Sequence, residues 1–279
     1  MTIPVSVLIL TYNEEKNIKR CLESVYWCND VVVLDSYSND STEDIVREVG
    51  VRFLQRNFDD YAGQRNYGIY EIKYKYDWLF MLDADEVFSV ELLEEIEHKL
   101  NDCDESICLF RLRRKDYFFG RWIKYSSTYS GLWLGRLMRI GSVWVQRSIN
   151  EEYQTRGKVE LLHSSLLHFP MNKGFHAWLE KHNRYSTMEA ELQFNKFFHD
   201  WKIGDLINID PAIRRKSLKA IVYSLPLRPV IVFMGLYFIK GGFLDGRQGL
   251  TYCILKTIYE YMIDCKVREL RQRSKNLPV

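Results

Sequence analysis

Three acidic residues directly follow an apolar run in the segment WLFMLDADE, residues 78–86. Asp83 and Asp85 stand two positions apart, and carboxylates this close repel unless a cation or hydrogen bonds offset the charge. Mg²⁺ and Mn²⁺ take oxygen ligands, often from one or two carboxylates with substrate phosphates completing the shell. Ser89 and Glu86 have a second explanation, since they precede the helical pattern VELLEEIEHKL and can cap it. Capping does not account for both aspartates, so the pattern favours a divalent cation site.

Four short apolar runs alternate with polar stretches of helical length in residues 1–105. The runs are rich in β-branched or bulky residues, as buried strands are. Such strands separated by helices indicate a parallel sheet covered on both faces. The predicted strands are Val5–Leu10, Val31–Leu34, Val51–Leu54 and Trp78–Leu82, and the predicted helices are Glu14–Tyr26, Ser41–Val49 and Ala62–Ile72.

Polar and acidic residues follow each of these predicted strands. In a parallel sheet, ligands bind beyond the carboxyl ends of the strands. Loops between strands and helices are polar in any case, so one such loop would mean little. Here the four loops together predict a ligand site at one edge of the sheet, and they read TYNEE (Thr11–Glu15), DSYSNDS (Asp35–Ser41), QRNFDD (Gln55–Asp60) and DADE (Asp83–Glu86).

The rest of the chain has a different pattern. Residues 106–169 contain alternating segments such as ICLFRLR and GRLMRI, which predict a mixed or antiparallel extension of the sheet. Phe175–His199 has the length of a long helix. Three further helical stretches are predicted from Pro211 onward, interrupted by two prolines and a pair of glycines.

Charge and cysteine content limit the classes of protein that fit. The net charge is +2, but from residue 200 onward Lys and Arg exceed Asp and Glu by seven. The tail is therefore expected to meet an anionic surface such as lipid headgroups or phosphorylated glycans, and no basic-aromatic motif favours nucleic acid. The six cysteines form no CxxC pair, which predicts a reduced, intracellular protein. The apolar N-terminus lacks a basic segment and a cleavage site, so it is expected to be a strand.

Four of these segments resemble glycosyltransferase family 2, whose members have the GT-A fold and use nucleotide-diphosphate sugars. They occur in the family's order and spacing over residues 3–90, and they read VSVLILTYNEEKNIKRCLESV, VVVLDSYSNDST, AGQRNYGI and FMLDADE. The resemblance implies an α/β fold of GT-A type, with a mixed, mainly parallel sheet between helices and a helical C-terminal extension. It implies a catalytic domain over 1–200, with a nucleotide-sugar-binding half (1–105) and an acceptor-side half (106–200). A basic, membrane-associating helical tail would follow over 201–279.

The resemblance also implies roles for individual residues. Tyr12, Asn13 and Glu14 would line the nucleoside pocket. Asp35 would hydrogen-bond the base or ribose, and Gln64 and Arg65 would close over the base. Bound Mg²⁺ or Mn²⁺ would neutralise the leaving diphosphate. The implied substrate-binding residues are Thr11, Tyr12, Asn13, Glu14, Asp35, Gln64, Arg65, Asp83, Ala84, Lys181 and Arg184, and the implied metal ligands are Asp83, Asp85 and His168.

A catalytic base is expected in the segment SINEEYQTRGKVELLHSSLLHF. Direct displacement at the anomeric carbon needs a base opposite the leaving group and inverts the configuration. The segment resembles the subgroup that adds sugars to lipopolysaccharide cores, in which a His-Glu pair supplies the base. Asn150 stands in place of that His, Glu151 is the matching carboxylate, and Glu152 is its rival. Adjacent glutamates at a strand end are otherwise simply solvated.

Some of these residues also have a purely structural interpretation. His168 ends an apolar run and is either a metal or diphosphate contact or a hydrogen-bonded core residue. Lys181 and Arg184 fall on one helical face, where they bind pyrophosphate or an anionic acceptor or form an exposed basic patch.

The uncharged run PVIVFMGLYFI, residues 229–239, is too short to cross about 30 Å of hydrocarbon as a helix. Basic residues before it and RELRQRSK at the end of the chain favour an element lying in the membrane interface. The segment YFIKGGFLDGRQGL resembles the tail of the same lipopolysaccharide subgroup. A buried helix is the alternative.

The sequence and the resemblance together predict an inverting, metal-dependent glycosyltransferase. It would move glucose or another hexose from a UDP-sugar to a lipid-linked glycan such as lipopolysaccharide core. It would be cytoplasmic and peripherally associated with the inner face of the membrane. The alternatives are a transferase for capsule, another oligosaccharide or a protein, and a non-catalytic nucleotide-sugar-binding protein. The oligomeric state stays open.

Overall fold

The structure, a computed structural model, describes residues 3–146, 152–195 and 227–278. The chain forms two compact units, unit 1 from residues 1–117 and 129–173, and unit 2 from residues 118–128 and 174–279. Unit 2 begins before residue 200 because helix α5 (Gly174–Asn195) packs against the C-terminal helix α8 (Gly246–Ser274). The division into a catalytic domain and a membrane-associating tail stays a prediction.

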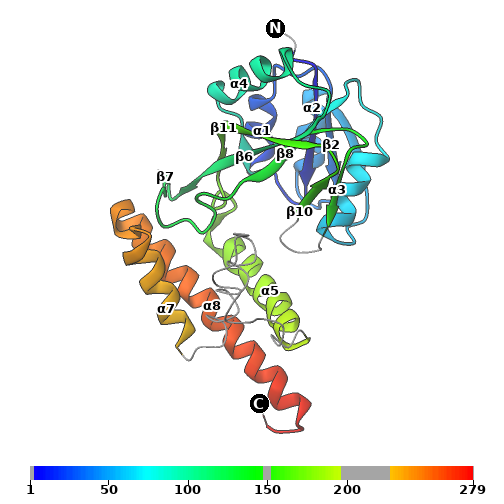
Figure 1. The fold of residues 1–279 in the computed structure, drawn as a ribbon. Helices are drawn as coiled ribbons and strands as arrows, with labels where there is room; N and C mark the ends of the chain where they lie inside the picture. The colour runs from blue at the N-terminus through cyan, green and yellow to red at the C-terminus, as the bar shows by residue number, and fades with distance from the viewer. Residues whose placement is uncertain (1–2, 147–151, 196–226, 279) are drawn as a thin grey trace. The chain divides into compact units, whose positions relative to one another are not determined.

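The first half of the unit 1 sheet is parallel, as the sequence predicts (Figure 1). Its strands lie in the order β3-β2-β1-β4. Thr11 is opposite Asp35 and Leu10 is opposite Asp83, so the loops that follow these strands meet at one edge. The bounds are β1 (Val5–Thr11), β2 (Val31–Asp35), β3 (Arg52–Gln55) and β4 (Trp78–Asp83).

The second half of the sheet is mixed, which confirms the predicted extension. Strand β8 is antiparallel to both β4 and β6, whereas β11 runs parallel to β6. The short strand β5 closes the order on β11, and β9 and β10 form a separate two-stranded sheet. The bounds are β5 (Glu86–Val87), β6 (Ile107–Phe118), β8 (Leu134–Arg139), β9 (Val143–Gln146), β10 (Glu152–Thr155) and β11 (Lys158–His168).

Alternate residues of the central strands pack on opposite faces of the sheet. Val7 and Ile9 of β1 join the cluster that contains α1, α2 and α4, whereas Leu8 joins Ile69 of α3 and the β9–β10 sheet. Both faces are therefore covered, which explains why these strands read as continuous apolar runs. The helices are α1 (Ile18–Ser24), α2 (Thr42–Val49), α3 (Tyr61–Tyr70) and α4 (Val90–Asn101).

Helix α1 begins four residues later than the Glu14 start that the sequence predicts. The preceding loop is held by other bonds, because Asn13 has a φ of 54° and the Glu14 N–H donates to the Thr42 hydroxyl at 2.8 Å. The predicted cap of α4 is confirmed, since the Leu92 N–H donates to the Ser89 hydroxyl at 3.3 Å.

Unit 2 is helical. The segment 118–128, with the short strand β7 (Arg121–Trp122), is held by the Asp245 carboxylate, which accepts bonds from the backbone N–H groups of residues 124–126 at 2.7–3.0 Å. The predicted run 229–239 is helical, and the stretch that follows Pro211 lies outside the described residues. The remaining elements are α7 (Arg228–Met234), the π-helical η2 (Gly235–Ile239) and the 3₁₀ turn η3 (Gly242–Asp245).

None of the helices described has by itself the length and apolar composition needed to cross a membrane. Arg228–Ile239 and Gly242–Ser274 meet those criteria only as a pair, and the pair is bent by 71°.

Close packing at Gly249 provides a test of the unit 2 fold. A Cβ there would lie 2.2 Å from the Gly242 carbonyl oxygen, which is backbone and cannot rotate away. We expect Gly249→Ala to lower the free energy of unfolding by about 1–3 kcal/mol because of this overlap.

Gly235→Ala is the matched control, because a Cβ at Gly235 meets nothing within 4 Å and helix propensity favours Ala by about 1 kcal/mol. Thermal unfolding followed by circular dichroism measures both variants. Equal melting temperatures for the two would contradict the packing argument.

Candidate active site

Asp35 organises the carboxyl end of β1 and β2. Its fully buried carboxylate accepts hydrogen bonds from the Thr11 hydroxyl at 2.8 Å and from the Ser38 hydroxyl at 2.5 Å. The Ser38 N–H donates to the same carboxylate at 2.8 Å. These bonds join the two loops and fix their backbones. The rings of Tyr12 and Tyr37 stand half exposed on the same loops, so each presents an open aromatic face.

The third loop joins the same edge through Gln64. The Gln64 amide donates to the Ser36 hydroxyl at 3.2 Å and accepts from the Arg56 guanidinium at 2.7 Å. The structure therefore brings Gln64 beside the loop that follows Asp35.

Asp83 lies between two arginines. Its carboxylate is 3.0 Å from Arg65 Nη2 and 2.7 Å from Arg136 Nη2. Burial opposes ionisation of this carboxyl, but Arg136 and Arg65 outweigh burial and hold the Asp83 pKa far below its usual value. The guanidinium of Arg65 also donates to the Tyr153 hydroxyl at 3.2 Å, which fixes its orientation.

Arg136 binds a second acid, the fully buried Glu86, at 2.7 Å. The other Glu86 oxygen accepts the Asp83 N–H at 3.1 Å, so one carboxylate positions both the backbone and the cation around Asp83. Burial raises the pKa of Glu86, the Arg136 charge lowers it, and the Asp83 charge raises it again. The two acids therefore share Arg136 as a common counter-charge.

His168 and Asp85 face each other beside this cluster. His168 Nε2 is 3.3 Å from Asp85 Oδ2, and Nδ1 is 2.7 Å from Asp116 Oδ1. Burial and Arg114 lower the His168 pKa, but Asp85 and Asp116 outweigh them, so the net shift is upward. A carboxylate that bonds one imidazole nitrogen orients the ring and leaves the other nitrogen to bind a metal. His168 is thus hydrogen-bonded and able to serve as a ligand.

This donor set fits a divalent cation. Asp85 offers a carboxylate oxygen, the ligand type that Mg²⁺ and Mn²⁺ both take together with phosphate oxygens and water. The His168 imidazole nitrogen, 3.3 Å away, is a ligand type that suits a transition metal such as Mn²⁺ better than Mg²⁺. The residues described contain no group of three or more His, Cys, Asp or Glu side chains arranged to hold a metal ion. Both Asp83 oxygens contact guanidinium groups, and its role as a metal ligand stays a prediction.

Two further cations stand near the acids of this edge. Lys173 Nζ donates to Glu14 at 2.7 Å and to the Tyr12 carbonyl oxygen at 3.1 Å. Burial raises the Glu14 pKa and the nearby Asp85 charge raises it further, while Lys173 opposes the shift. The Arg20 guanidinium lies 3.7 Å from the centre of the Phe169 ring and is attracted by Asp85. The site therefore carries positive charge beside its acids.

Several of these residues were not predicted from the sequence. Most of them lie on strands far apart in the chain that become neighbours in the fold. The pairing of β6 with β11, for example, sets Asp116 opposite His168. Arg20 and Tyr153 stand inside segments that carry the family resemblance but have no role assigned there, and no local motif marks the others. They are Arg20, Arg114, Asp116, Arg136, Tyr153 and Lys173.

Other predicted residues lie elsewhere or outside the description. Glu151 and Asn150 fall outside the described residues, while Glu152 begins β10 and is exposed. Lys181 and Arg184 are exposed on α5 of unit 2, whereas the other predicted site residues belong to unit 1. Ala84 is buried between the two aspartates.

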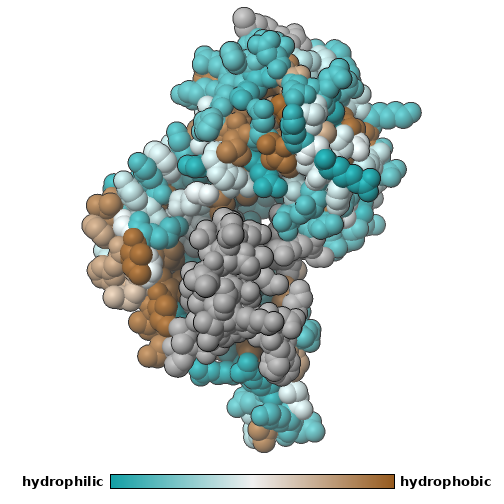
Figure 2. All heavy atoms as spheres, in the orientation of Figure 1, coloured by the Kyte–Doolittle hydropathy of each residue, from teal (hydrophilic) through white to brown (hydrophobic). Residues whose placement is uncertain are grey.

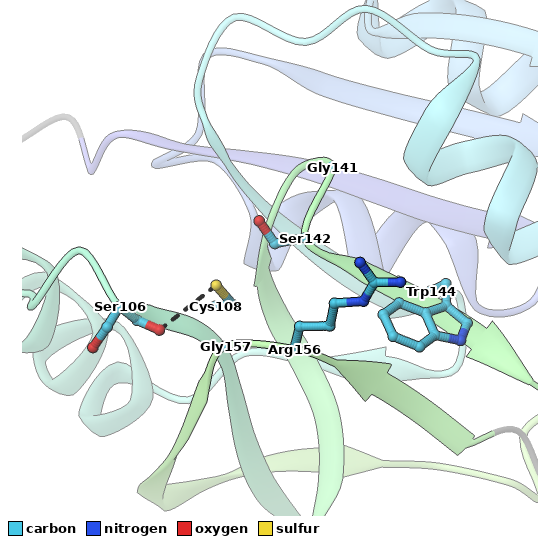
Figure 3. Close-up of a pocket in the computed structure, with 7 residues that line it drawn as sticks. All are labelled: Ser106, Cys108, Gly141, Ser142, Trp144, Arg156 and Gly157. Carbon is cyan, nitrogen blue, oxygen red and sulfur yellow. Dashed lines mark hydrogen bonds between the residues drawn. The ribbon is translucent and has the colours of Figure 1, made fainter.

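An open pocket of about 580 Å³ in unit 1 is not part of this site (Figure 3). It lies among the loops before β6 and after β8, beside Ser106, Ser142 and Arg156. Arg139 at the end of β8 pairs with Trp78 at the start of β4, so the pocket adjoins the amino end of β4. The acidic cluster follows the carboxyl end of the same strand.

A mixed, mainly parallel sheet between helices, with polar and acidic loops gathered at the carboxyl ends of its strands, is the architecture expected of a GT-A glycosyltransferase. The profile of glycosyl transferase family 2 matches residues 6–177. The chain belongs to this family and is a glycosyltransferase, which confirms the class predicted from the sequence.

Among its relatives is LpsC of Rhizobium meliloti (strain 1021), named a lipopolysaccharide core biosynthesis glycosyltransferase. LpsC is 27% identical over 277 residues, which cover 95% of this chain and 92% of LpsC. SunS of Bacillus subtilis (strain 168), a prophage-derived glycosyltransferase, is 39% identical over 88 residues, 30% of this chain and 20% of SunS.

Solved structures with some likeness include residues 1–349 of TarS from S. aureus, with 15% identity, a TM-score of 0.44 and coverage of 98% of this chain and 92% of TarS. Another is glucosyl-3-phosphoglycerate synthase from Mycobacterium tuberculosis, in complex with Mn²⁺, UDP and glucosyl-3-phosphoglycerate. It has 19% identity and a TM-score of 0.35, and the match covers 40% of this chain and 44% of the synthase.

Arg136 provides a test of the acidic cluster. We expect Arg136→Met to lower the free energy of unfolding by about 3–5 kcal/mol, because it leaves Glu86 buried without its strongest counter-charge. Lys99→Met is the control, since the Lys99–Glu160 pair at 2.9 Å is half-exposed at the surface and contributes about 1 kcal/mol or less. Urea unfolding measures both, and equal losses would contradict the assigned role of Arg136.

Proposed function

We propose that the protein is an inverting, metal-dependent glycosyltransferase that uses a UDP-sugar donor. The observation that supports this proposal best is the Asp85–His168 pair, 3.3 Å apart, beside an Asp83 held by Arg65 and Arg136. Asp85 and His168 offer ligands for a cation, and Asp83 offers an ionised carboxylate in a fixed orientation. A nucleotide diphosphate with its divalent cation matches both.

The nucleoside binds at the loops after β1 and β2. Asp35 already accepts bonds from Thr11 and Ser38, and its position at the sheet edge suits a hydrogen bond to the base or ribose. The half-exposed rings of Tyr12 and Tyr37 supply faces on which a base can stack.

The diphosphate binds on the side of Asp85. When bound there, Mg²⁺ or Mn²⁺ supplies Lewis-acid stabilisation of the leaving group. Asp85 and His168 would hold the cation, and Asp116 keeps the His168 ring in position. Arg20 and Lys173 add positive charge close to the same acids. Asp83, kept ionised by its two arginines, accepts hydrogen bonds from the sugar hydroxyls.

Glu151 acts as the base that takes the proton from the acceptor hydroxyl, and Glu152 is the alternative. A single displacement at the anomeric carbon inverts its configuration.

The acceptor is a lipid-linked glycan such as lipopolysaccharide core, as the name of LpsC suggests. Glucose or another hexose is the transferred sugar. Lys181 and Arg184 would contact anionic groups of the acceptor, and transfer would occur at the cytoplasmic face of the inner membrane.

The base assignment is tested with the pair Glu151→Gln and Glu152→Gln, which differ by one position and share the same change of charge. We expect Glu151→Gln to lower the transfer rate about 10²–10⁴-fold, the usual contribution of a general base, while UDP affinity stays within twofold. Glu152→Gln should retain transfer. The measurement is sugar transfer to purified lipopolysaccharide core or another lipid-linked acceptor, with calorimetric titration of UDP.

If Glu152→Gln is the inactive variant, the role moves to Glu152. If neither change affects a measurable transfer rate, the proposed mechanism is wrong. UDP binding without any transfer or hydrolysis in the wild-type protein would instead favour the non-catalytic alternative.

The cation site is tested by binding. We expect Asp85→Asn to weaken Mn²⁺-dependent UDP binding about 10–100-fold or more, because it removes one charged ligand. Asp104→Asn is the control, since Asp104 pairs with Lys158 on the surface of unit 1. Calorimetry with UDP and Mn²⁺, and then with EDTA, gives the affinities. UDP affinity that is indifferent to EDTA and to Asp85→Asn would refute a metal at this position.

A further inference from the structure

We propose that unit 2 docks on an anionic lipid bilayer through one apolar face, made by the outward side chains of α7, η2, η3 and the first half of α8. This inference gives the predicted membrane association a defined surface. It rests on the exposure and charge of unit 2, so it is tested separately from sugar transfer.

The apolar face consists of side chains that helical spacing places on one side of each helix. Met234 and Phe238 are four residues apart, as are Leu250 and Ile254, and Phe243 stands in the turn between them. Each of these five side chains is more than a third exposed. Figure 2 shows hydrophobic side chains gathered over α7 and the adjoining part of α8. Isolated exposed apolar residues are common, but a continuous stripe on two packed helices marks an interaction surface.

The opposite sides of both helices are already used inside unit 2. Leu236 of η2 is buried, and Gly249, Cys253 and Ile263 of α8 are buried as well. Helix α8 therefore carries two apolar sides, one packed within unit 2 and one exposed. Its outward stripe is not a part of the core.

The exposed charges of the same segment have one sign. Within 227–278, no Asp or Glu is exposed, since Asp245 and Glu260 are buried and Asp264 and Glu269 half-buried. Asp245 binds backbone N–H groups, and the guanidinium of the buried Arg228 pairs with Glu260 and Asp264. The exposed charged residues of this segment are all basic, and they are Lys240, Arg247, Arg268, Arg271, Arg273 and Lys275.

Lys240 and Arg247 lie along the chain among the residues of the apolar face, and the other four exposed basic residues follow on the last part of α8 and just after it. This combination of apolar and basic side chains matches an anionic bilayer. Apolar side chains enter the interface while Lys and Arg meet anionic headgroups, at about 1 kcal/mol for each basic residue near the surface. A second copy of this chain fits less well, because symmetrical contact would bring two basic surfaces together.

The geometry also favours lying on the membrane over crossing it. Residues 228–239 rise by about 18 Å as a helix, against a hydrocarbon core of about 30 Å. The chain then turns by 71° into α8, and the ion pairs of Arg228 with Glu260 and Asp264 tie α7 to α8. The two helices thus present their outward sides as one fixed surface.

The test is flotation of the full chain with vesicles of phosphatidylcholine alone or mixed with phosphatidylglycerol. We expect binding to the anionic vesicles, weakened by salt, and at least tenfold weaker binding to the neutral ones. Phe238→Asp and Ile254→Asp should each reduce the partition constant about tenfold or more. Val90→Asp is the matched control, because Val90 is an exposed apolar residue on α4 of unit 1. Circular dichroism checks that each variant is folded.

Equal binding by wild type and both variants would overturn the proposal, as would equal binding to neutral and anionic vesicles. A wild-type dimer that Phe238→Asp and Ile254→Asp convert to monomer, without vesicle binding, would assign the face to a second copy instead. UDP-sugar hydrolysis, measured without lipid, reports on the proposed function alone. Retained hydrolysis with lost flotation in the variants supports the docking face.

Discussion

The interaction on which the site depends is the shared use of Arg136 by Asp83 and Glu86. Two carboxylates three positions apart at the end of a buried strand would repel each other and resist ionisation. A guanidinium 2.7 Å from each carboxylate removes that conflict, and Arg65 adds a second contact to Asp83. Arg136 comes from β8, which pairs antiparallel with β4. The acidic loop can therefore form only when the mixed half of the sheet is assembled beside the parallel half.

The same principle extends to the neighbouring histidine. Asp116 on β6 bonds His168 on β11, and Arg114 neutralises Asp116 in turn at 3.0 Å. Acids and cations thus alternate from Arg65 to His168 across β4, β8, β6 and β11. Each buried charge has a partner of opposite sign, which keeps the cost of desolvation low enough for the cluster to stay charged. A rigid set of charges of this kind can receive a diphosphate and a cation without reorganisation.

Buried charges are also paired in unit 2, where the pairing affects the charge of the surface. Arg228, Asp245 and Glu260 are buried with partners, while the basic side chains remain outside. The tail is basic in sequence, and within the described residues 227–278 the fold increases that asymmetry at the surface, because the acids there are buried or half-buried. A moderately basic helical segment becomes a surface of one sign beside an exposed apolar stripe.

The amino-acid sequence by itself determined the parallel half of the fold, the family and the loops that carry Asp35, Asp83 and Asp85. These features are local, since apolar runs of strand length and polar residues at their ends can be read along the chain. Tertiary structure alone decided which charged partners meet the predicted site residues. Arg136, Asp116 and Lys173 lie 53, 52 and 159 positions along the chain from their partners Asp83, His168 and Glu14, and folding brings each pair together. The physical reason is that hydrophobic periodicity and secondary-structure propensity depend on residues close in the sequence. Charge compensation depends instead on distance in space, which only the folded sheet sets.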